Sequence, residues 1–209
     1  SVTGEMIHQK WQPYANLMTL KSGKQPFRMY QVMTFDGTLE LSPGKLDGNG
    51  KAGFDKAMLS SDHYEFNRRS LKADSARFSL KTPDDQAIAL NALNYQANID
   101  FDKGTGQFMA STAPRVDYPV FSMVSDHRRF DWDMGLKRIL FSSPGQEQEY
   151  KRILSLSPSQ AIVAEEAGEL KGPSFLYLRP DLDSLRFYSF TATYHIDQTR
   201  IDAGDVPFI

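Results

Sequence analysis

Apolar and polar side chains alternate with a period of two over much of this chain, and this pattern constrains the fold more than any other feature. A β-strand points successive side chains to opposite faces, so the alternation predicts strands with one buried and one solvated face. Five runs show it, at residues 75–81, 94–101, 116–120, 130–134 and 188–197. A single buried face is typical of an antiparallel sheet or of a sheet curled around its own core. We therefore predict an all-β fold with an elongated antiparallel or curled sheet, sandwich-like or solenoid-like.

Turn-forming residues separate the alternating runs. Gly, Asn and Asp adopt the backbone angles that chain reversals need, and Pro favours the first corner of a turn. Residues 102–106 lie between two alternating runs and predict a hairpin loop. Further reversals are expected at residues 42–44, 47–50, 82–85 and 197–200.

Residues 144–173 interrupt the strand pattern. Glu147–Leu156 and Ser159–Leu170 have helix-forming composition, and Ser159 is a candidate cap for the second segment. Prolines stand at both edges of the stretch and between the two segments. We expect one insertion here, either a loop or one or two short helical turns.

The domain organisation follows from the extent of the pattern. We assign residues 27–209 to a single β-rich domain and residues 1–26 to a flanking segment. The chain begins without Met and ends on the apolar residues Val206-Pro207-Phe208-Ile209. We interpret it as a fragment of a longer protein.

The composition excludes several classes of function. The 24 basic and 26 acidic residues give a net charge of −2, which argues against a protein that holds nucleic acid, because phosphate binding needs a basic excess. The absence of cysteine excludes disulfides, thiolate nucleophiles and zinc–thiolate sites. No apolar stretch approaches the roughly 18 residues that span a bilayer. We expect no transmembrane segment and no cofactor.

Residues with catalytic potential are scattered along the sequence. The four histidines are far apart, none has zincin spacing, and no nucleophile elbow or phosphate loop is present. Asp131 and Asp133 flank Trp132, and His127 lies just before them. A hydrolase would require at least two of Asp131, Asp133, His127 and His63 to converge. A calcium loop beginning at Asp47 has Met58 at the position where glutamate is needed. We expect neither an enzyme nor a metal site.

Aromatic residues are abundant and are ordinary partners in a sheet core. A few of them are candidates for a surface platform that would stack against sugar rings. We select the residues Trp11, Tyr14, Tyr30 and Trp132.

Several short motifs resemble elements of very large, β-rich, uncharacterised envelope or surface proteins of Bacteroidota. They are Phe35-Asp36-Gly37-Thr38-Leu39-Glu40-Leu41-Ser42-Pro43, Leu46-Asp47-Gly48-Asn49-Gly50, Ala97-Asn98-Ile99-Asp100-Phe101 and Phe130-Asp131-Trp132-Asp133-Met134. The resemblance covers most of residues 27–209 and implies an extended β-structure within a long envelope chain, without known catalytic residues. The strand pattern is also similar to the curled groove of bridge-like lipid-transfer proteins.

The leading hypothesis is a non-catalytic structural or interaction module of a large bacterial envelope or surface protein. Its partners would be neighbouring modules of the same parent chain or other envelope proteins. Two alternatives stay open. A carbohydrate-binding β-sandwich predicts a row of exposed aromatic rings, and a lipid-conducting β-groove predicts a continuous apolar concave face that is open to solvent.

Overall fold

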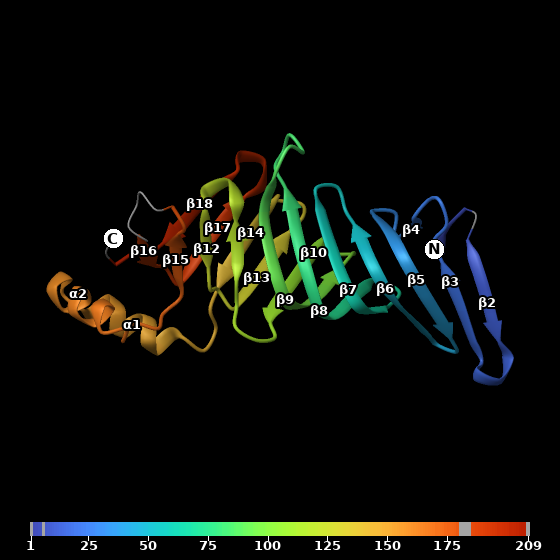
Figure 1. Cartoon of the computed structure of the whole chain (residues 1–209), viewed down its shortest axis with the longest axis horizontal. Helices are drawn as coiled ribbons and strands as arrows, with labels where there is room; N and C mark the ends of the chain where they lie inside the picture. The colour runs from blue at the N-terminus through green and yellow to red at the C-terminus, as the bar shows by residue number, and fades with distance from the viewer. Residues whose placement is uncertain (1, 6, 180–184, 208–209) are drawn as a thin grey trace.

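The protein is an elongated body built on one large antiparallel sheet (Figure 1). The computed structural model describes residues 2–5, 7–179 and 185–207. Strands make up 54% of the chain and helices 14%, and the sheet is not closed. The predicted all-β class is therefore confirmed.

The strands differ greatly in length, and the long ones occupy the middle of the body. The elements are β1 (Val2–Thr3), β2 (His8–Gln12), β3 (Leu17–Lys21), β4 (Phe27–Met29), β5 (Met33–Ser42), β6 (Lys45–Gly53), β7 (Ala57–Phe66), β8 (Ser70–Lys81), β9 (Ile88–Asp100), β10 (Thr105–Ala110), β11 (Val116–Tyr118), β12 (Met123–Ser125), β13 (Arg129–Asp133), β14 (Arg138–Ser142), α1 (Glu147–Ser155), α2 (Pro158–Glu166), β15 (Ser174–Tyr177), β16 (Arg186–Tyr188), β17 (Thr191–His195) and β18 (Arg200–Gly204).

Strands β5 to β9 are folded across their middle, so that the two halves of the sheet face each other. The alternation shows where each strand bends. In β7 the buried residue after Ser61 is Tyr64, three positions later, whereas strict alternation would place the next buried residue two positions later. The same odd step occurs from Ala73 to Ala76 in β8 and from Ala92 to Tyr95 in β9. Because each odd step switches the inward parity, both halves of a strand bury their side chains in one core. We call this line of bends the crease.

Glycines carry the crease through β5 and β6. Gly50 has φ +142°, and a Cβ atom there would lie 2.3 Å from the carbonyl oxygen of Asp36. Gly37 lies opposite, where a Cβ would come within 2.1 Å of the Asn49 carbonyl oxygen. The turn predicted at residues 47–50 is therefore wrong. Those residues lie inside β6, and their glycines permit the close approach of two backbones rather than a reversal.

The sheet splits into two separate layers at each end. The two halves of β9 pair with different strands, residues 91–92 with β11 and residues 95–100 with β10. One layer continues through β13, β14, β17 and β18, and the other through β12, β15 and β16. At the opposite end β5 pairs with both β4 and β3. The alternating run 188–197 is consequently not one strand, because β16 and β17 belong to different layers.

The segment before Phe27 forms part of the same sheet. Residues 1–26 were expected to be a flanking segment, but β3 pairs with β5 over Met18–Lys21 and β2 pairs with β3. The β2–β3 hairpin turns through Pro13–Ala15 and a left-handed Asn16. The β11–β12 hairpin repeats this turn with Pro119–Phe121 and Ser122.

Aromatic side chains fill the space between the layers. Phe78, on one layer, lies 4.9 Å from Phe108 and 5.5 Å from Phe130 on the other, measured between ring centroids. These three rings are at most 1% exposed. The interior is a packed core, because its side chains interdigitate across the full gap between the layers.

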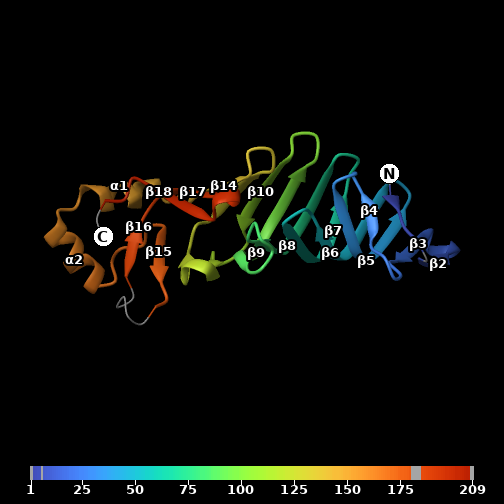
Figure 2. The ribbon, with the colours of Figure 1, turned by 90° about the horizontal axis from the view of Figure 1, so that it is seen from above.

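Two helices cover the end of the body that holds β15 and β16 (Figure 2). Tyr150 and Ile153 of α1 and Ala164 of α2 pack with Leu170 and Tyr188 in a second, smaller apolar cluster. The predicted insertion at 144–173 thus contains two helices. Ser159 is not the cap of the second one. Ser157 occupies that position, since its side chain accepts from the Gln160 amide in a capping box.

Candidate functional site

The bent strands bring the two rims of the folded sheet close together. The first rim includes the turns at 30–32, 54–56 and 82–87, and the second includes the turns at 43–44, 67–69, 101–104, 134–137 and 196–199. We call the line between them the seam. It is closed by side chains, in contrast to the crease, which is continuous backbone.

Tyr30 closes the seam near the β1–β4 end. Its ring stacks on Phe101 of the opposite rim at a centroid distance of 4.0 Å, and its hydroxyl donates to the Asn67 carbonyl oxygen at 2.5 Å. Burial raises the pKa of Tyr30 to about 12, so the hydroxyl remains a donor at neutral pH. Phe54 continues the closure, with its ring 5.4 Å from that of Trp132.

Beyond Phe54 the seam opens into a cavity of about 480 Å³, which we call the seam cavity. Both rims contribute to its wall. The first supplies Val32, Phe54, Asp55, Lys56, Ala57, Leu80 and Pro83, and the second supplies Trp132, Met134, Lys137, Ile196 and Asp197. Its floor is the core itself, since Ala57, Leu80, Trp132 and Ile196 are buried. A volume of this size with a mainly apolar wall is typical of small-molecule sites.

Charged residues surround the mouth of the seam cavity and balance one another. Lys56 forms an ion pair with Asp85, and the Nζ of Lys137 lies 3.2 Å from the Oδ2 of Asp197. The hydrogen bond to Asp85 raises the pKa of Lys56. The cavity wall carries two lysines and two aspartates, so the mouth has no excess of either charge.

The four selected aromatic residues do not form one platform. Trp132 is 6% exposed, with its ring in the core, so it is not a surface residue. Its indole Nε1 is buried and has no hydrogen-bond partner within residues 2–5, 7–179 and 185–207. Tyr30 is half-buried in the seam, whereas Trp11 and Tyr14 are exposed on the β2–β3 hairpin. No local pattern predicts that Trp132 borders a cavity, because the opposite wall comes from turns that are far away along the chain.

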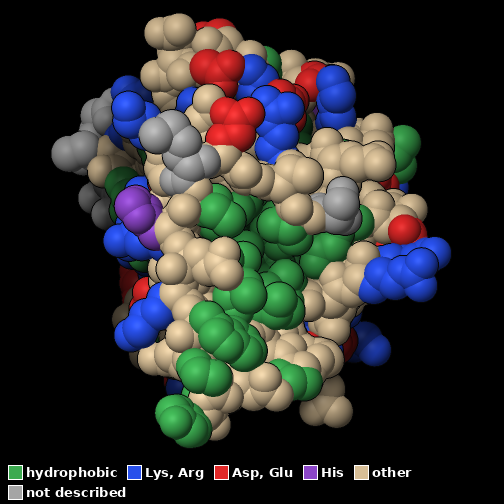
Figure 3. Space-filling model, turned by 90° about the vertical axis from the view of Figure 1, so that its right-hand side faces the viewer, with side chains coloured by type: hydrophobic (Ala, Val, Ile, Leu, Met, Phe, Trp, Pro, Cys, Tyr) green, Lys and Arg blue, Asp and Glu red, His purple; other side chains and the backbone are tan. Residues whose placement is uncertain are grey.

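The end of the body formed by β1 to β4 exposes apolar side chains (Figure 3). Trp11, Met18 and Leu41 lie opposite one another across β2, β3 and β5. They point to the same face as the core residue Leu39, two positions before Leu41. Trp11 is nevertheless 49% exposed and Leu41 44% exposed. Strands β1 and β4 of the other layer have only two and three residues, which explains why they leave this row uncovered. We call this surface the open end.

The residues considered for hydrolysis lie in separate environments. His127 is fully buried, and its Nε2 lies 3.0 Å from the Ser189 carbonyl oxygen. Burial lowers its pKa to about 4. Asp131 accepts two hydrogen bonds from Arg129, and Asp133 accepts from the Leu136 amide.

His63 forms no hydrogen bond with His127, Asp131 or Asp133 among the described residues. Its Nδ1 lies 2.8 Å from Asp74 on the exposed face of the sheet. The convergence that a hydrolase would require therefore has no shared hydrogen-bond network in the described part of the chain.

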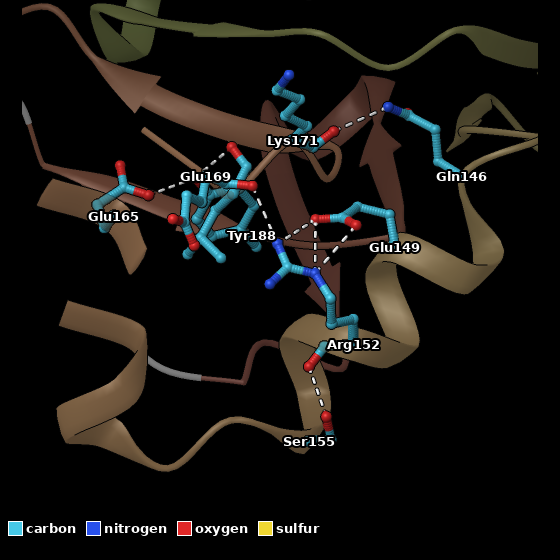
Figure 4. A network of polar contacts seen from close by, with 9 residues as sticks. Gln146, Glu149, Arg152, Ser155, Glu165, Glu169, Lys171 and Tyr188 are labelled. Carbon is cyan, nitrogen blue, oxygen red and sulfur yellow. Dashed lines mark hydrogen bonds and ion pairs between the residues drawn. The ribbon is translucent and has the colours of Figure 1, made fainter. Parts of the chain in front are cut away.

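Polar contacts hold the helices against the end of the sheet (Figure 4). Arg152 of α1 binds Glu149 at 2.7 Å and also donates to the Glu169 carbonyl oxygen at 2.9 Å. The Tyr188 hydroxyl of β16 donates to Glu165 of α2. Burial, together with the Glu165 hydrogen bond, raises the pKa of Tyr188 to about 12. These contacts join the helices to neighbouring segments of the same chain, and we interpret their role as structural.

Residues 2–5, 7–179 and 185–207 contain neither a candidate metal cluster nor a helix that could span a membrane. These residues contain no group of three or more His, Asp or Glu side chains placed to hold a metal ion. The helices among them are all too short or too polar to cross a bilayer.

Comparison with known proteins adds no relative. No family model, curated protein or solved structure matches the chain.

Proposed function

We propose that this chain is a non-catalytic interaction module of a large bacterial envelope or surface protein, and that it binds a neighbouring module through the open end. The observation that carries the proposal is the difference between the two ends of the body. Helices α1 and α2 cover one end with their own apolar cluster, whereas the other end leaves inward-facing residues of the sheet in contact with water.

The edge strand β2 supports the same interpretation. It pairs with β3 on one side, and no other strand among the described residues pairs with it. An unpaired edge can accept a further antiparallel strand. A neighbour that added a strand there and covered Trp11, Met18 and Leu41 would bury apolar surface and satisfy the free backbone groups together.

The alternative functions receive less support from the geometry. The concave face of the sheet is filled by Phe35, Tyr64, Phe78, Phe108 and Phe130, so no continuous open groove runs between the layers in the described residues. For carbohydrate binding, the exposed aromatic pair is Trp11 and Tyr14, on one hairpin. Loss of glycan binding in Trp11→Ala would favour that alternative.

Self-association tests the proposal, because an uncovered open end on one copy can pair with the same surface on a second copy around a two-fold axis. We expect a reversible dimer in sedimentation velocity over a concentration series. Trp11→Lys should raise the dimer dissociation constant at least about tenfold, as for a tryptophan at the centre of an interface.

Val120→Lys is the matched control. Val120 is 46% exposed in the β11–β12 hairpin turn, which has the same conformation as the turn after β2. This variant should dimerise like the unmodified chain. A Trp11→Lys variant that dimerises like the unmodified chain, or a Val120→Lys variant that weakens the dimer equally, would refute the open end as the binding surface.

A further inference from the structure

We propose that the seam cavity binds the hydrocarbon chain of a single-chain amphiphile whose head group carries no net charge, such as a lysophospholipid with a zwitterionic head. The inference is independent of the open end, because the two surfaces share no residue. It rests on the buried apolar residues at the floor of the cavity and on the balance of charges at its mouth.

The first step concerns the floor. Leu80, Trp132 and Ile196 belong to the core, yet they border a cavity of about 480 Å³ that opens between exposed residues of the rims. Apolar surface in contact with water is unfavourable, and a ligand gains by replacing that water. An apolar ligand can therefore enter from solvent and reach the core without passing through a strand.

The second step concerns shape. The cavity lies between two rims that side chains join, so hydrogen bonds of the sheet do not close it. Phe54 and Lys56 lie on one side and Met134 and Lys137 on the other. A slot between two facing rims suits a narrow chain that lies along it, with its polar end at the mouth.

The third step concerns charge. Lys56 and Lys137 are the cationic residues of the wall, and each already pairs with an aspartate. An anionic head would meet Asp55 and Asp197 as well as these paired lysines. A zwitterionic head meets complementary charges of both signs, which is why we assign the site to an amphiphile without net charge.

The chain offers a direct readout, because it contains only two tryptophans and one of them borders the cavity. In the Trp11→Phe variant, all tryptophan fluorescence comes from Trp132. We would titrate this variant with lysophosphatidylcholine that carries bromine atoms on its chain, below the micelle concentration. Bromine quenches tryptophan only at short range, so saturable quenching reports a chain inside the cavity. A brominated fatty acid serves as the anionic comparison.

Two cavity-filling variants and one control complete the design, all made in the Trp11→Phe background. Ala57→Leu and Met134→Phe enlarge wall residues and should each weaken quenching at least about tenfold, because they occupy the volume that the ligand needs. Met109→Phe places the same ring on the exposed face of β10, away from the cavity, and should bind normally. Far-ultraviolet circular dichroism confirms that each variant is folded.

Saturable quenching by lysophosphatidylcholine that exceeds quenching by the fatty acid, and that falls in the two filling variants, supports the proposal. Absence of quenching by both amphiphiles overturns it. Stronger binding of the fatty acid overturns the assigned head group, and equal quenching in Ala57→Leu, Met134→Phe and Met109→Phe overturns the assigned location.

Discussion

His127 should make the stability of this protein fall as the pH is lowered from 8 to 5. The imidazole is fully buried between Phe141 and Phe175, with ring centroids 5.8 and 5.0 Å away. Its Nε2 lies within hydrogen-bond distance of the Ser189 carbonyl oxygen, whereas its Nδ1 has no hydrogen-bond partner among the residues that the structure describes. A proton on Nδ1 would place an uncompensated charge in the core, which is why the pKa falls to about 4.

The sign and size of the effect follow from proton linkage. Between the folded pKa of about 4 and the ordinary value of 6.5, the unfolded chain binds a proton at this residue and the folded chain does not. Stability is therefore fully present above pH 6.5 and decreases on acidification. For these two values the free energy of unfolding should decrease by about 2 kcal/mol between pH 8 and pH 5.

Other ionisable groups also change the dependence of stability on pH, and the direction of each change follows from its pKa shift. Burial raises the pKa of Asp126, so this residue favours the folded state as it takes up a proton, opposite to His127. Arg186 is the nearby cation that interacts with Asp126. The carboxyl groups with lowered pKa values, such as Asp85 and Asp202, affect stability only below their unfolded pKa near 4.

Urea unfolding of the unmodified chain and of His127→Gln, measured at several pH values, isolates the contribution. Glutamine keeps an amide donor for Ser189 but does not titrate. The difference between the two proteins should therefore shrink by about 2 kcal/mol from pH 8 to pH 5. Met109→Gln, which changes an exposed residue that does not titrate, serves as the control and should keep the slope of the unmodified chain. Equal slopes for the unmodified chain and His127→Gln would refute the reasoning.

Three further substitutions test the seam, the crease and the helix cap, each by urea unfolding at pH 7. Tyr30→Phe removes the hydrogen bond to the Asn67 carbonyl oxygen and should lower the free energy of unfolding by about 1 kcal/mol. An unchanged urea midpoint would show that the bond does not stabilise the seam. Gly37→Ala forces a Cβ against the Asn49 carbonyl oxygen and should cost about 2 kcal/mol or more, so a neutral result would contradict the close approach at the crease. Ser157→Ala should cost about 1 kcal/mol through the lost cap, and no loss would show that the cap is unimportant in this helix.

The sequence predicted the strand faces well because alternation is a local property. Tyr95, Ala97 and Ile99 point into the core as expected, and residues 102–106 form the predicted hairpin around Gly104. Period-two patterning says which side of a strand is buried, but it says nothing about which strand lies beside it. For that reason the division of residues 188–197 between two layers could not be read from the pattern.

The crease could not be predicted from the sequence, for a different reason. The odd steps in β7, β8 and β9 are single irregularities within otherwise regular strands, and each alone is indistinguishable from a weak match to the pattern. The glycines at 48 and 50 indicated a turn because turns are the commonest use of such residues. Their role at a close approach between backbones depends on Gly37, which lies in another strand.

The candidate site was the least predictable part. The seam cavity joins Lys56 to Met134 and Ile196, residues separated by long stretches of chain. Turn residues carry little periodic signal, and the meeting of two rims depends on how sharply the sheet bends. Among the selected aromatics, the buried position of Trp132 follows from the same curvature.

Because β5 to β9 each run through both layers, neither layer can melt in the middle of the body without the other. Local opening should instead begin at the split ends, where β2 can detach from β3 and β18 can detach from β17. In amide hydrogen exchange we expect the best-protected backbone in β7 and β8, with protection decreasing outward in both directions. The middle of the folded sheet thus unfolds as one cooperative unit, whereas its ends open locally.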